Sequence, residues 1–161
     1  MTPVKTNAMR LLEKAGIHYR VHPYETGREV PDGVTVAGKI GMPPAQVFKT
    51  LVTIGASRTF YVFVIPVAKE LDLKAAARAA GEKAVAMIKA ADIEKATGYI
   101  RGGCSPLGMK KDYQTFFDQS ANLHETIVVS AGKIGLQMEV IAADLVGLCK
   151  GKTANLSEGD R

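Results

Sequence analysis

The fold is decided by the stretch Val47-Phe-Lys-Thr-Leu-Val-Thr-Ile54 and, after a short turn, Thr59-Phe-Tyr-Val-Phe-Val-Ile-Pro-Val67. β-Branched and aromatic residues dominate both segments, which is the composition of strands, and Gly55-Ala-Ser57 supplies the turn between them. The second segment is almost wholly apolar, as in a strand that is buried on both of its faces. These residues therefore predict two consecutive strands joined by a turn, the second of them buried on both faces.

Outward from this pair, helical and strand periodicities alternate along the chain. Apolar spacing and capping residues predict helices at 6–15, 34–40, 73–80, 92–98 and 143–149. Period-two patterns and turn residues predict further strands at 17–24, 84–88, 115–117, 126–129 and 136–141. Strands separated by helices of unequal length indicate one mixed α/β domain, and the close spacing of the last three strands argues against a purely parallel sheet. We expect residues 1–150 to form this domain and residues 151–161 to form a frayed, flexible tail.

The composition is that of a globular domain rather than a disordered or membrane protein. Of 161 residues 47% are hydrophobic and 23% are charged, and 21 Lys and Arg exceed 16 Asp and Glu, which is compatible with a polyanionic partner. No run approaches the ~18 apolar residues of a membrane span, and the first residues lack the apolar core of a signal peptide. We therefore expect a cytoplasmic protein with no membrane partner.

Lys49 is the first candidate for chemistry. Period two places it on the same face as Val47 and Leu51, so its ammonium group must reach water or meet an anion. One interpretation is an edge-strand lysine whose head lies in solvent. The other is a cation in a cleft that binds a phosphate or polarises a carbonyl. The sequence leaves both interpretations of Lys49 open.

The second candidate is the loop 98–108, which holds four glycines and a proline. The adjacent Gly102 and Gly103 allow backbone N–H groups to approach a ligand closely and to form a donor site for an oxygen anion. A plain tight turn is the alternative. The loop matches neither the P-loop nor the dinucleotide fingerprint. Cys104 in this loop is a candidate nucleophile, but nothing in the sequence identifies its base.

A third candidate is Val129-Ser-Ala-Gly-Lys133, where Ser130 stands at the end of a predicted strand. Most serines in such positions only satisfy a turn. The three histidines are too scattered for a metal set, and Cys104 and Cys149 form no CxxC or Cys/His cluster. We therefore expect two reduced thiols, no metal and no cofactor.

Taken together, these segments resemble the YbaK/EbsC proteins, the free-standing relatives of the bacterial prolyl-tRNA synthetase editing domain. The matching motifs are Lys5-Thr-Asn-Ala-Met9, Val47-Phe-Lys-Thr-Leu51, Glu70-Leu-Asp-Leu-Lys74, Thr97-Gly-Tyr-Ile-Arg-Gly-Gly-Cys-Ser-Pro-Leu-Gly-Met-Lys-Lys111 and Val129-Ser-Ala-Gly-Lys133. Their order and spacing match from about residue 5 to residue 148. The combination is specific, although each piece alone is weak.

The resemblance implies an α/β (α+β) fold with a mixed, barrel-like sheet surrounded by helices. It also implies an enzyme, an aminoacyl-tRNA deacylase that hydrolyses mischarged Cys-tRNA(Pro) and also Cys-tRNA(Cys). Its implied partners are the acceptor end of tRNA(Pro) and prolyl-tRNA synthetase. Such editing is needed because a binding pocket rejects an amino acid of similar size by only about 1–3 kcal/mol.

The resemblance also implies roles for residues at matching positions. Lys49 would anchor the terminal nucleotide and orient the ester, and the backbone amides of Gly102 and Gly103 would hold the aminoacyl carbonyl. The implied substrate-binding residues are Tyr24, Thr50, Ser105 and Ser130. In this family the substrate thiol attacks its own ester carbonyl and leaves as a cyclic thiolactone, which would make Cys104 unnecessary.

The chain departs from the family pattern at two places. Many members have an aromatic residue where this chain has Pro31, Asp32 and Gly33, and many have an acidic residue where it has Gln137. Both departures bear on substrate preference. The alternatives are a deacylase for Ala-tRNA(Pro), which needs water or a ribose hydroxyl as nucleophile, and a non-catalytic module that binds the tRNA acceptor end.

Overall fold

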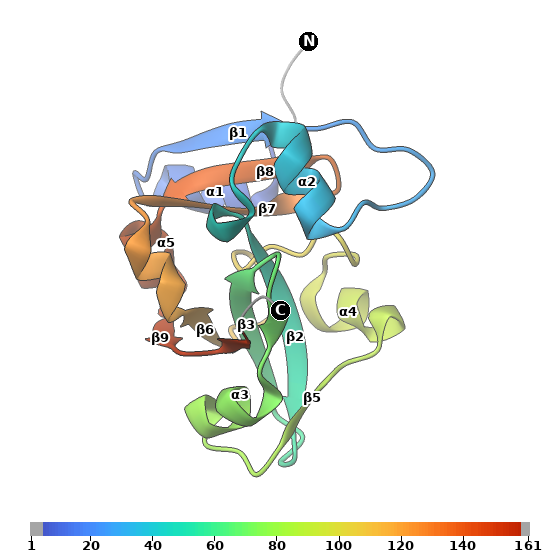
Figure 1. Cartoon of the computed structure of the whole chain (residues 1–161), viewed down its shortest axis with the longest axis vertical. Coiled ribbons are helices and arrows are strands. Elements are labelled where there is room, and N and C mark those ends of the chain that lie inside the picture. The colour runs from blue at the N-terminus through green and yellow to red at the C-terminus, as the bar shows by residue number, and fades with distance from the viewer. Residues whose placement is uncertain (1–4, 159–161) are drawn as a thin grey trace.

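The computed structural model describes residues 5–158 (Figure 1). The helices are α1 (Asn7–Lys14), α2 (Gly33–Ile40), α3 (Leu73–Ala80), α4 (Ala90–Thr97) and α5 (Ala142–Leu148), with short 3₁₀ turns at Pro44–Gln46 and Gln119–Leu123. The strands are β1 (Tyr19–Pro23), β2 (Phe48–Gly55), β3 (Phe60–Pro66), β4 (Glu70–Leu71), β5 (Val85–Met87), β6 (Gln114–Asp118), β7 (Thr126–Lys133), β8 (Leu136–Ile141), β9 (Lys152–Ala154) and β10 (Ser157–Glu158). In this part of the chain no helix combines the length and the apolar character that crossing a membrane requires.

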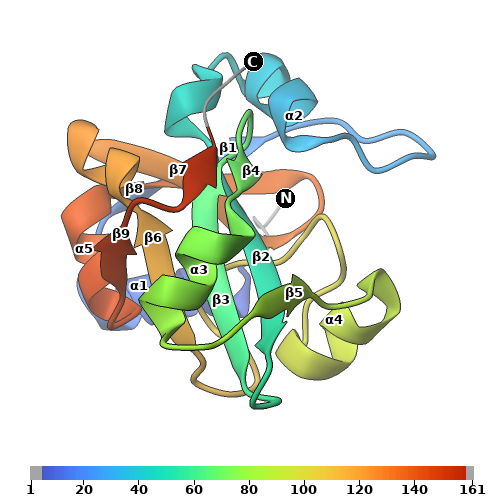
Figure 2. The same cartoon turned by 60° about the horizontal axis from the view of Figure 1, so that its bottom comes forward.

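The two strands predicted first, β2 and β3, lie side by side in the largest sheet. β2 and β3 pair antiparallel from Phe48 opposite Pro66 to Ile54 opposite Phe60. The five-stranded sheet has the order β5-β2-β3-β6-β9, and its β3–β6 and β6–β9 pairs are parallel. Figure 2 shows β3 between β2 and β6, with α3 crossing in front of it. The mixed α/β fold predicted from the sequence is confirmed.

The sheets do not close on one another, so the word barrel-like describes the fold only loosely. A second sheet has the order β1-β8-β7, and a third contains only β10 and β4. A single bridge between Val47 and Val128 connects the start of β2 to β7. β7 and β8 form the antiparallel hairpin that the spacing predicted, with a bulge between Ser130 and Lys133.

Both faces of β3 are buried, as its apolar run predicted. Val62 and Val64 belong to a cluster that packs against α1, β7 and β8, with Leu12 and Met138 among its buried members. Phe63 belongs to the opposite cluster, which packs against α3. β3 thus separates two cores and fixes β2 beside it.

The structure corrects the prediction for the C-terminal tail. Residues 152–154 pair with β6, residues 157–158 pair with β4, and Leu156 is completely buried among the residues beneath α3. The Oδ1 atom of Asp118 accepts hydrogen bonds from the N–H groups of Leu156 at 2.9 Å and Ser157 at 3.2 Å. Strands this short show no periodicity in sequence. They are stabilised by pairing with a distant strand, which the local sequence does not reveal. The last three predicted tail residues, 159–161, lie outside the described residues.

Replacing Asp118 by alanine is therefore expected to destabilise the protein by about 2–4 kcal/mol, since each buried N–H left without a partner costs about 1–3 kcal/mol. Urea unfolding followed by circular dichroism measures this. The matched control is Asp112→Ala, because Asp112 is exposed and lies two residues before β6. Equal midpoints for the two variants would show that Asp118 does not hold the tail.

Candidate active site

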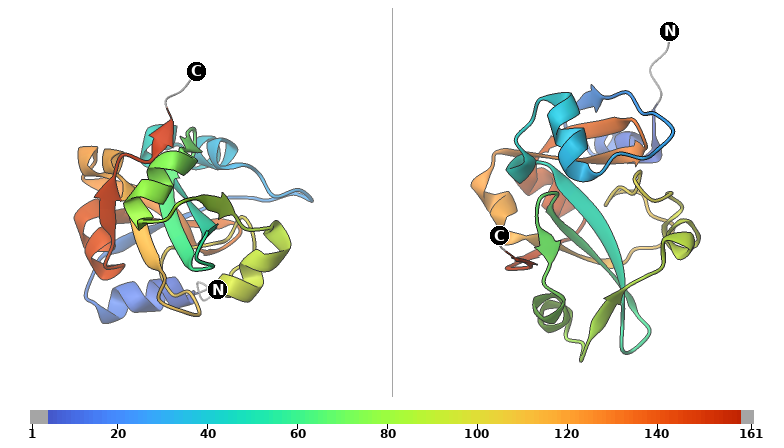
Figure 3. Two further views of the ribbon diagram at one scale, coloured as in Figure 1. Left: turned by 90° about the horizontal axis from the view of Figure 1, so that it is seen from below. Right: turned by 45° about the vertical axis from the view of Figure 1, so that its right-hand side comes forward.

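A cavity of about 960 Å³ opens along the first half of β2. Figures 1 and 3 show that α2 lies above the start of β2 and α4 lies to its side, so this half of the strand runs between the two helices. The cavity walls come from β2, the loop 24–33, the start of α2, the segment around α4, the glycine-rich loop, β7 and β8. Most of the predicted site residues meet here although they are distant in sequence: Tyr24, Lys49, Thr50, Gly102 and Ser130.

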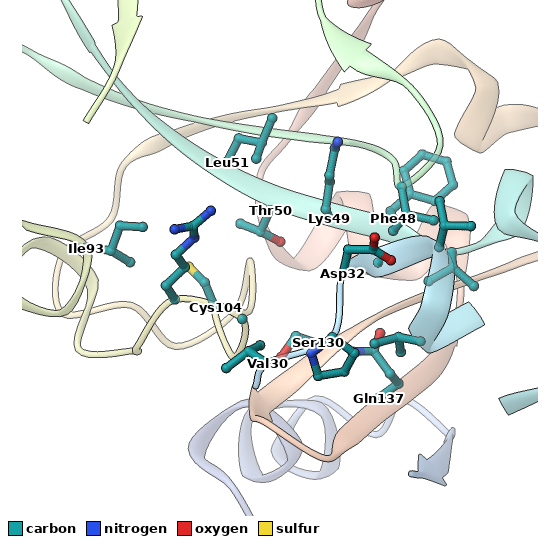
Figure 4. A pocket seen from close by; sticks show the side chains of 18 of the residues that line it. Val30, Asp32, Phe48, Lys49, Thr50, Leu51, Ile93, Cys104, Ser130 and Gln137 are labelled. Carbon is teal, nitrogen blue, oxygen red and sulfur yellow. The ribbon is translucent and has the colours of Figure 1, made fainter. Parts of the chain in front are cut away.

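Lys49 and Thr50 lie on opposite faces of β2, and both line the cavity. Figure 4 shows the Lys49 side chain pointing away from Thr50, which lies on the side of Cys104 and Ser130. The cavity therefore extends around the strand. One part has a lysine head, and the other part has hydroxyl and amide groups.

The ammonium group of Lys49 has no ion-pair partner among residues 5–158. Burial lowers the pKa of Lys49 below its ordinary value, and the carboxylates of Glu70 and Asp32 act in the opposite direction. Asp32 caps α2, where its Oδ1 accepts from the N–H of Thr35 at 2.8 Å. That hydrogen bond and, more weakly, the charge of Lys49 hold the pKa of Asp32 below its usual range. Lys49 is thus a partly desolvated cation that is available to an external anion.

The resemblance implies that Lys49 anchors tRNA, and on that basis this arrangement predicts a pH dependence of tRNA binding. Binding through the Lys49 cation is present below the lowered pKa of Lys49 and is lost as the pH rises through it. Glu70→Gln removes a charge that stabilises the cation, so the loss is expected at lower pH than in the wild type. The dissociation constant of uncharged tRNA(Pro), measured from about pH 7 to 10, tests this without ester hydrolysis. Asp144→Asn on α5 is the control, and an unshifted Glu70→Gln profile would contradict the expectation.

Glycine is required at positions 102 and 103 for two different structural reasons. Gly102 has a φ of +87°, and a Cβ atom there would lie 2.5 Å from Cγ1 of Val30. Gly103 packs directly on the backbone of the β7–β8 turn, since its Cβ would lie 3.0 Å from the Ile134 nitrogen. The N–H of Gly103 already donates to the carbonyl of Ile100 at 3.0 Å, whereas the N–H of Gly102 has no acceptor within residues 5–158. Gly102 therefore offers the free donor of the pair.

Two of the predicted residues do not reach the cavity. Gly103 and Ser105 are absent from its walls, and Ser105 is completely buried with its Oγ accepting from the N–H of Leu107 at 3.3 Å. The geometry gives Ser105 the role of closing a turn. Ser130 does line the cavity, although its Oγ also accepts from the N–H of Gly132 at 3.1 Å.

Cys104 lines the cavity but is poorly suited to be a nucleophile. Burial raises the pKa of its thiol to about 11, so the thiol stays protonated at neutral pH. Arg101 also lines the cavity beside the glycine pair, and Gln137 lies directly opposite Ser130 in the β7–β8 pair. Arg101 was within reach of sequence reasoning, because it precedes the two glycines. The apolar wall from the α4 region, Ile88, Ala90 and Ile93, carried no such signal.

Comparison with known proteins identifies the family. The model of the aminoacyl-tRNA editing domain matches residues 28–148, which include every segment that builds the cavity except Tyr24. The chain belongs to this family. The resemblance inferred from the motifs is therefore confirmed.

A relative of similar sequence and two solved structures of similar fold agree with this assignment. A protein of Enterococcus faecalis, provisionally named Cys-tRNA(Pro)/Cys-tRNA(Cys) deacylase EbsC, is 41% identical over 156 residues, covering 97% of this chain and 95% of the relative. The crystal structure of a protein provisionally described as a trans-editing enzyme for prolyl tRNA synthetase is 22% identical and has a TM-score of 0.82 over 97% of this chain and all of its own. The hypothetical protein APE2540 has a TM-score of 0.83 at 21% identity, over 92% of this chain and 97% of its own. At these identities the two structures establish the fold.

Proposed function

We propose that this protein is a trans-editing deacylase that removes cysteine from Cys-tRNA(Pro), and also from Cys-tRNA(Cys). The observation that carries this proposal is a cavity that combines a free cation and a free backbone donor with no nucleophile–base pair. Among the described residues the cavity wall contains no histidine, its one thiol is protonated, and its one carboxylate caps α2. The name of the relative at 41% identity supports the same substrates.

In the proposed mechanism the substrate supplies the nucleophile. Its thiol sulfur forms a bond to its own carbonyl carbon, the bond from that carbon to the ribose oxygen breaks, and the thiol proton passes to the ribose oxygen. Cysteine leaves as a thiolactone. Lys49 anchors the terminal nucleotide through its phosphate, and the N–H of Gly102 donates to the carbonyl oxygen as negative charge develops there. Tyr24 and Ser130 line the walls around the aminoacyl group.

A panel of four charged tRNAs tests the proposed function: Cys-tRNA(Pro), Cys-tRNA(Cys), Ala-tRNA(Pro) and Ser-tRNA(Pro). We expect loss of the two cysteinyl esters and survival of the alanyl and seryl esters, because only cysteine carries the attacking thiol. Comparable turnover of Ala-tRNA(Pro) would overturn the thiol-assisted mechanism. Binding of tRNA without turnover of any ester would leave a non-catalytic acceptor-end module.

We infer that prolyl-tRNA synthetase is a partner that delivers the mischarged tRNA. The net charge of +5 is modest for a protein that must bind tRNA by itself. One of the structural neighbours is described as acting for that synthetase. Deacylation rates measured with and without the synthetase test this inference: an increase in the apparent affinity for tRNA supports it, and unchanged kinetics contradict it.

A further inference from the structure

β2 has a free edge at Thr50. The hydrogen bonds from Val67 N–H to Val47 carbonyl and from Gly55 N–H to Thr59 carbonyl show that odd-numbered residues of β2 exchange main-chain bonds with β3. In an antiparallel pair such residues alternate, so the N–H and C=O of even-numbered residues point to the other edge. On that edge the carbonyl of Val52 accepts from Ile88 N–H.

Thr50 is left without a strand on this second edge. The paired part of β5 begins opposite Thr53, and the contact with β7 is the single bridge at Val47. Among residues 5–158 no main-chain partner reaches the Thr50 carbonyl from this side. The Thr50 carbonyl therefore remains an unused acceptor beside the cavity that Thr50 lines.

The Thr50 hydroxyl is unused as well. Its Oγ1 atom is buried and has no hydrogen-bond partner in the described part of the chain, a property it shares only with Ser120. A buried hydroxyl without a partner costs about 1–3 kcal/mol, so a ligand that donates a hydrogen bond to it would recover that free energy. Figure 4 places this side chain on the side of Cys104 and Ser130, away from the Lys49 head.

We propose that Thr50 recognises the α-ammonium group of the aminoacyl ester, through its main-chain carbonyl and its Oγ1. An ammonium group has only donors, and this one residue offers it two oxygen acceptors. The Lys49 ammonium points away from Thr50, so it does not occupy these two acceptors. This inference rests on the proposed deacylase function. It makes the enzyme selective for a free amino group, which the thiolactone chemistry itself does not require.

The test compares Cys-tRNA(Pro) with 3-mercaptopropionyl-tRNA(Pro), which keeps the thiol and the ester but lacks the amino group. Each enzymatic rate is divided by the spontaneous rate of the same ester, because the amino group also affects intrinsic lability. For the wild type we expect this ratio to be about 10- to 100-fold lower for the deaminated ester, as for loss of hydrogen bonds to a charged group. Equal ratios overturn the inference while leaving the deacylase function intact. Turnover of neither ester overturns both.

Two variants separate recognition by Thr50 from other causes. Thr50→Val has nearly the same shape without the hydroxyl, so we expect a lower ratio for Cys-tRNA(Pro) and little change for the deaminated ester. Thr50→Ser keeps the hydroxyl and is expected to retain the preference of the wild type. Circular dichroism confirms that both variants fold. An equal loss on both esters in Thr50→Val would show that Thr50 only supports the shape of the cavity, and would overturn the inference.

Discussion

Replacing Lys49 by alanine is expected to lower kcat/KM for Cys-tRNA(Pro) by about 10²–10³-fold, the range seen when a group that binds developing or fixed negative charge is removed. The reason is geometric and electrostatic. Lys49 is a partly desolvated cation in the cavity wall, and it has no ion-pair partner among residues 5–158. Single-turnover deacylation at several enzyme concentrations measures the loss and separates binding from chemistry.

Two variants make this prediction specific. Lys49→Arg keeps the charge and is expected to recover part of the activity, because the guanidinium is larger and differently shaped. Lys74→Ala removes an exposed lysine from α3, outside the cavity, and is expected to behave as the wild type. If Lys74→Ala lost as much activity as Lys49→Ala, general charge would explain the effect and a specific role for Lys49 would be wrong.

The elements that could be predicted from sequence are those with local signals. Asp72 before α3 and Gly81 after it cap that helix, with the Asp72 side chain accepting from Ala75 N–H and Gly81 in the left-handed region. The apolar run of β3 is also a local signal. It predicted that both faces of this strand are buried, because apolar residues follow one another along its length. β9 and β10 lack any such signal and depend on contacts with β6 and β4.

The same distinction between local signals and distant contacts applies to the candidate site. The motifs identified Lys49 and Gly102, because their residue types are unusual for their positions and the family resemblance gave them roles. The motifs could not distinguish Gly102 from Gly103, since only the turn at Ile100 shows which N–H is already bonded. Nor could they show that Ser105 is buried in a turn, or that Thr50 stands at a free strand edge. Those facts depend on how distant segments pack.

Gly102→Ala is expected to lower kcat for Cys-tRNA(Pro) by about 10²-fold, the effect of displacing one donor to a developing oxyanion. Alanine is strained at a φ of +87°, and its Cβ would lie 2.5 Å from Cγ1 of Val30. The loop must therefore move, and the N–H of Gly102 must move with it. Because the ground-state contacts of Lys49 remain, we expect KM to change much less than kcat.

The matched control for backbone strain is Gly81→Ala. Gly81 has a φ of +73°, yet its Cβ would meet nothing within 4 Å, and it ends α3 outside the cavity. Gly81→Ala is expected to lose stability of about 1 kcal/mol with unchanged kcat. The double variant Gly102→Ala/Val30→Ala removes the methyl group that clashes, so it is expected to regain part of the lost kcat. A double variant no better than Gly102→Ala would locate the defect in the strained backbone itself, and a full-activity Gly102→Ala would remove its N–H from the mechanism.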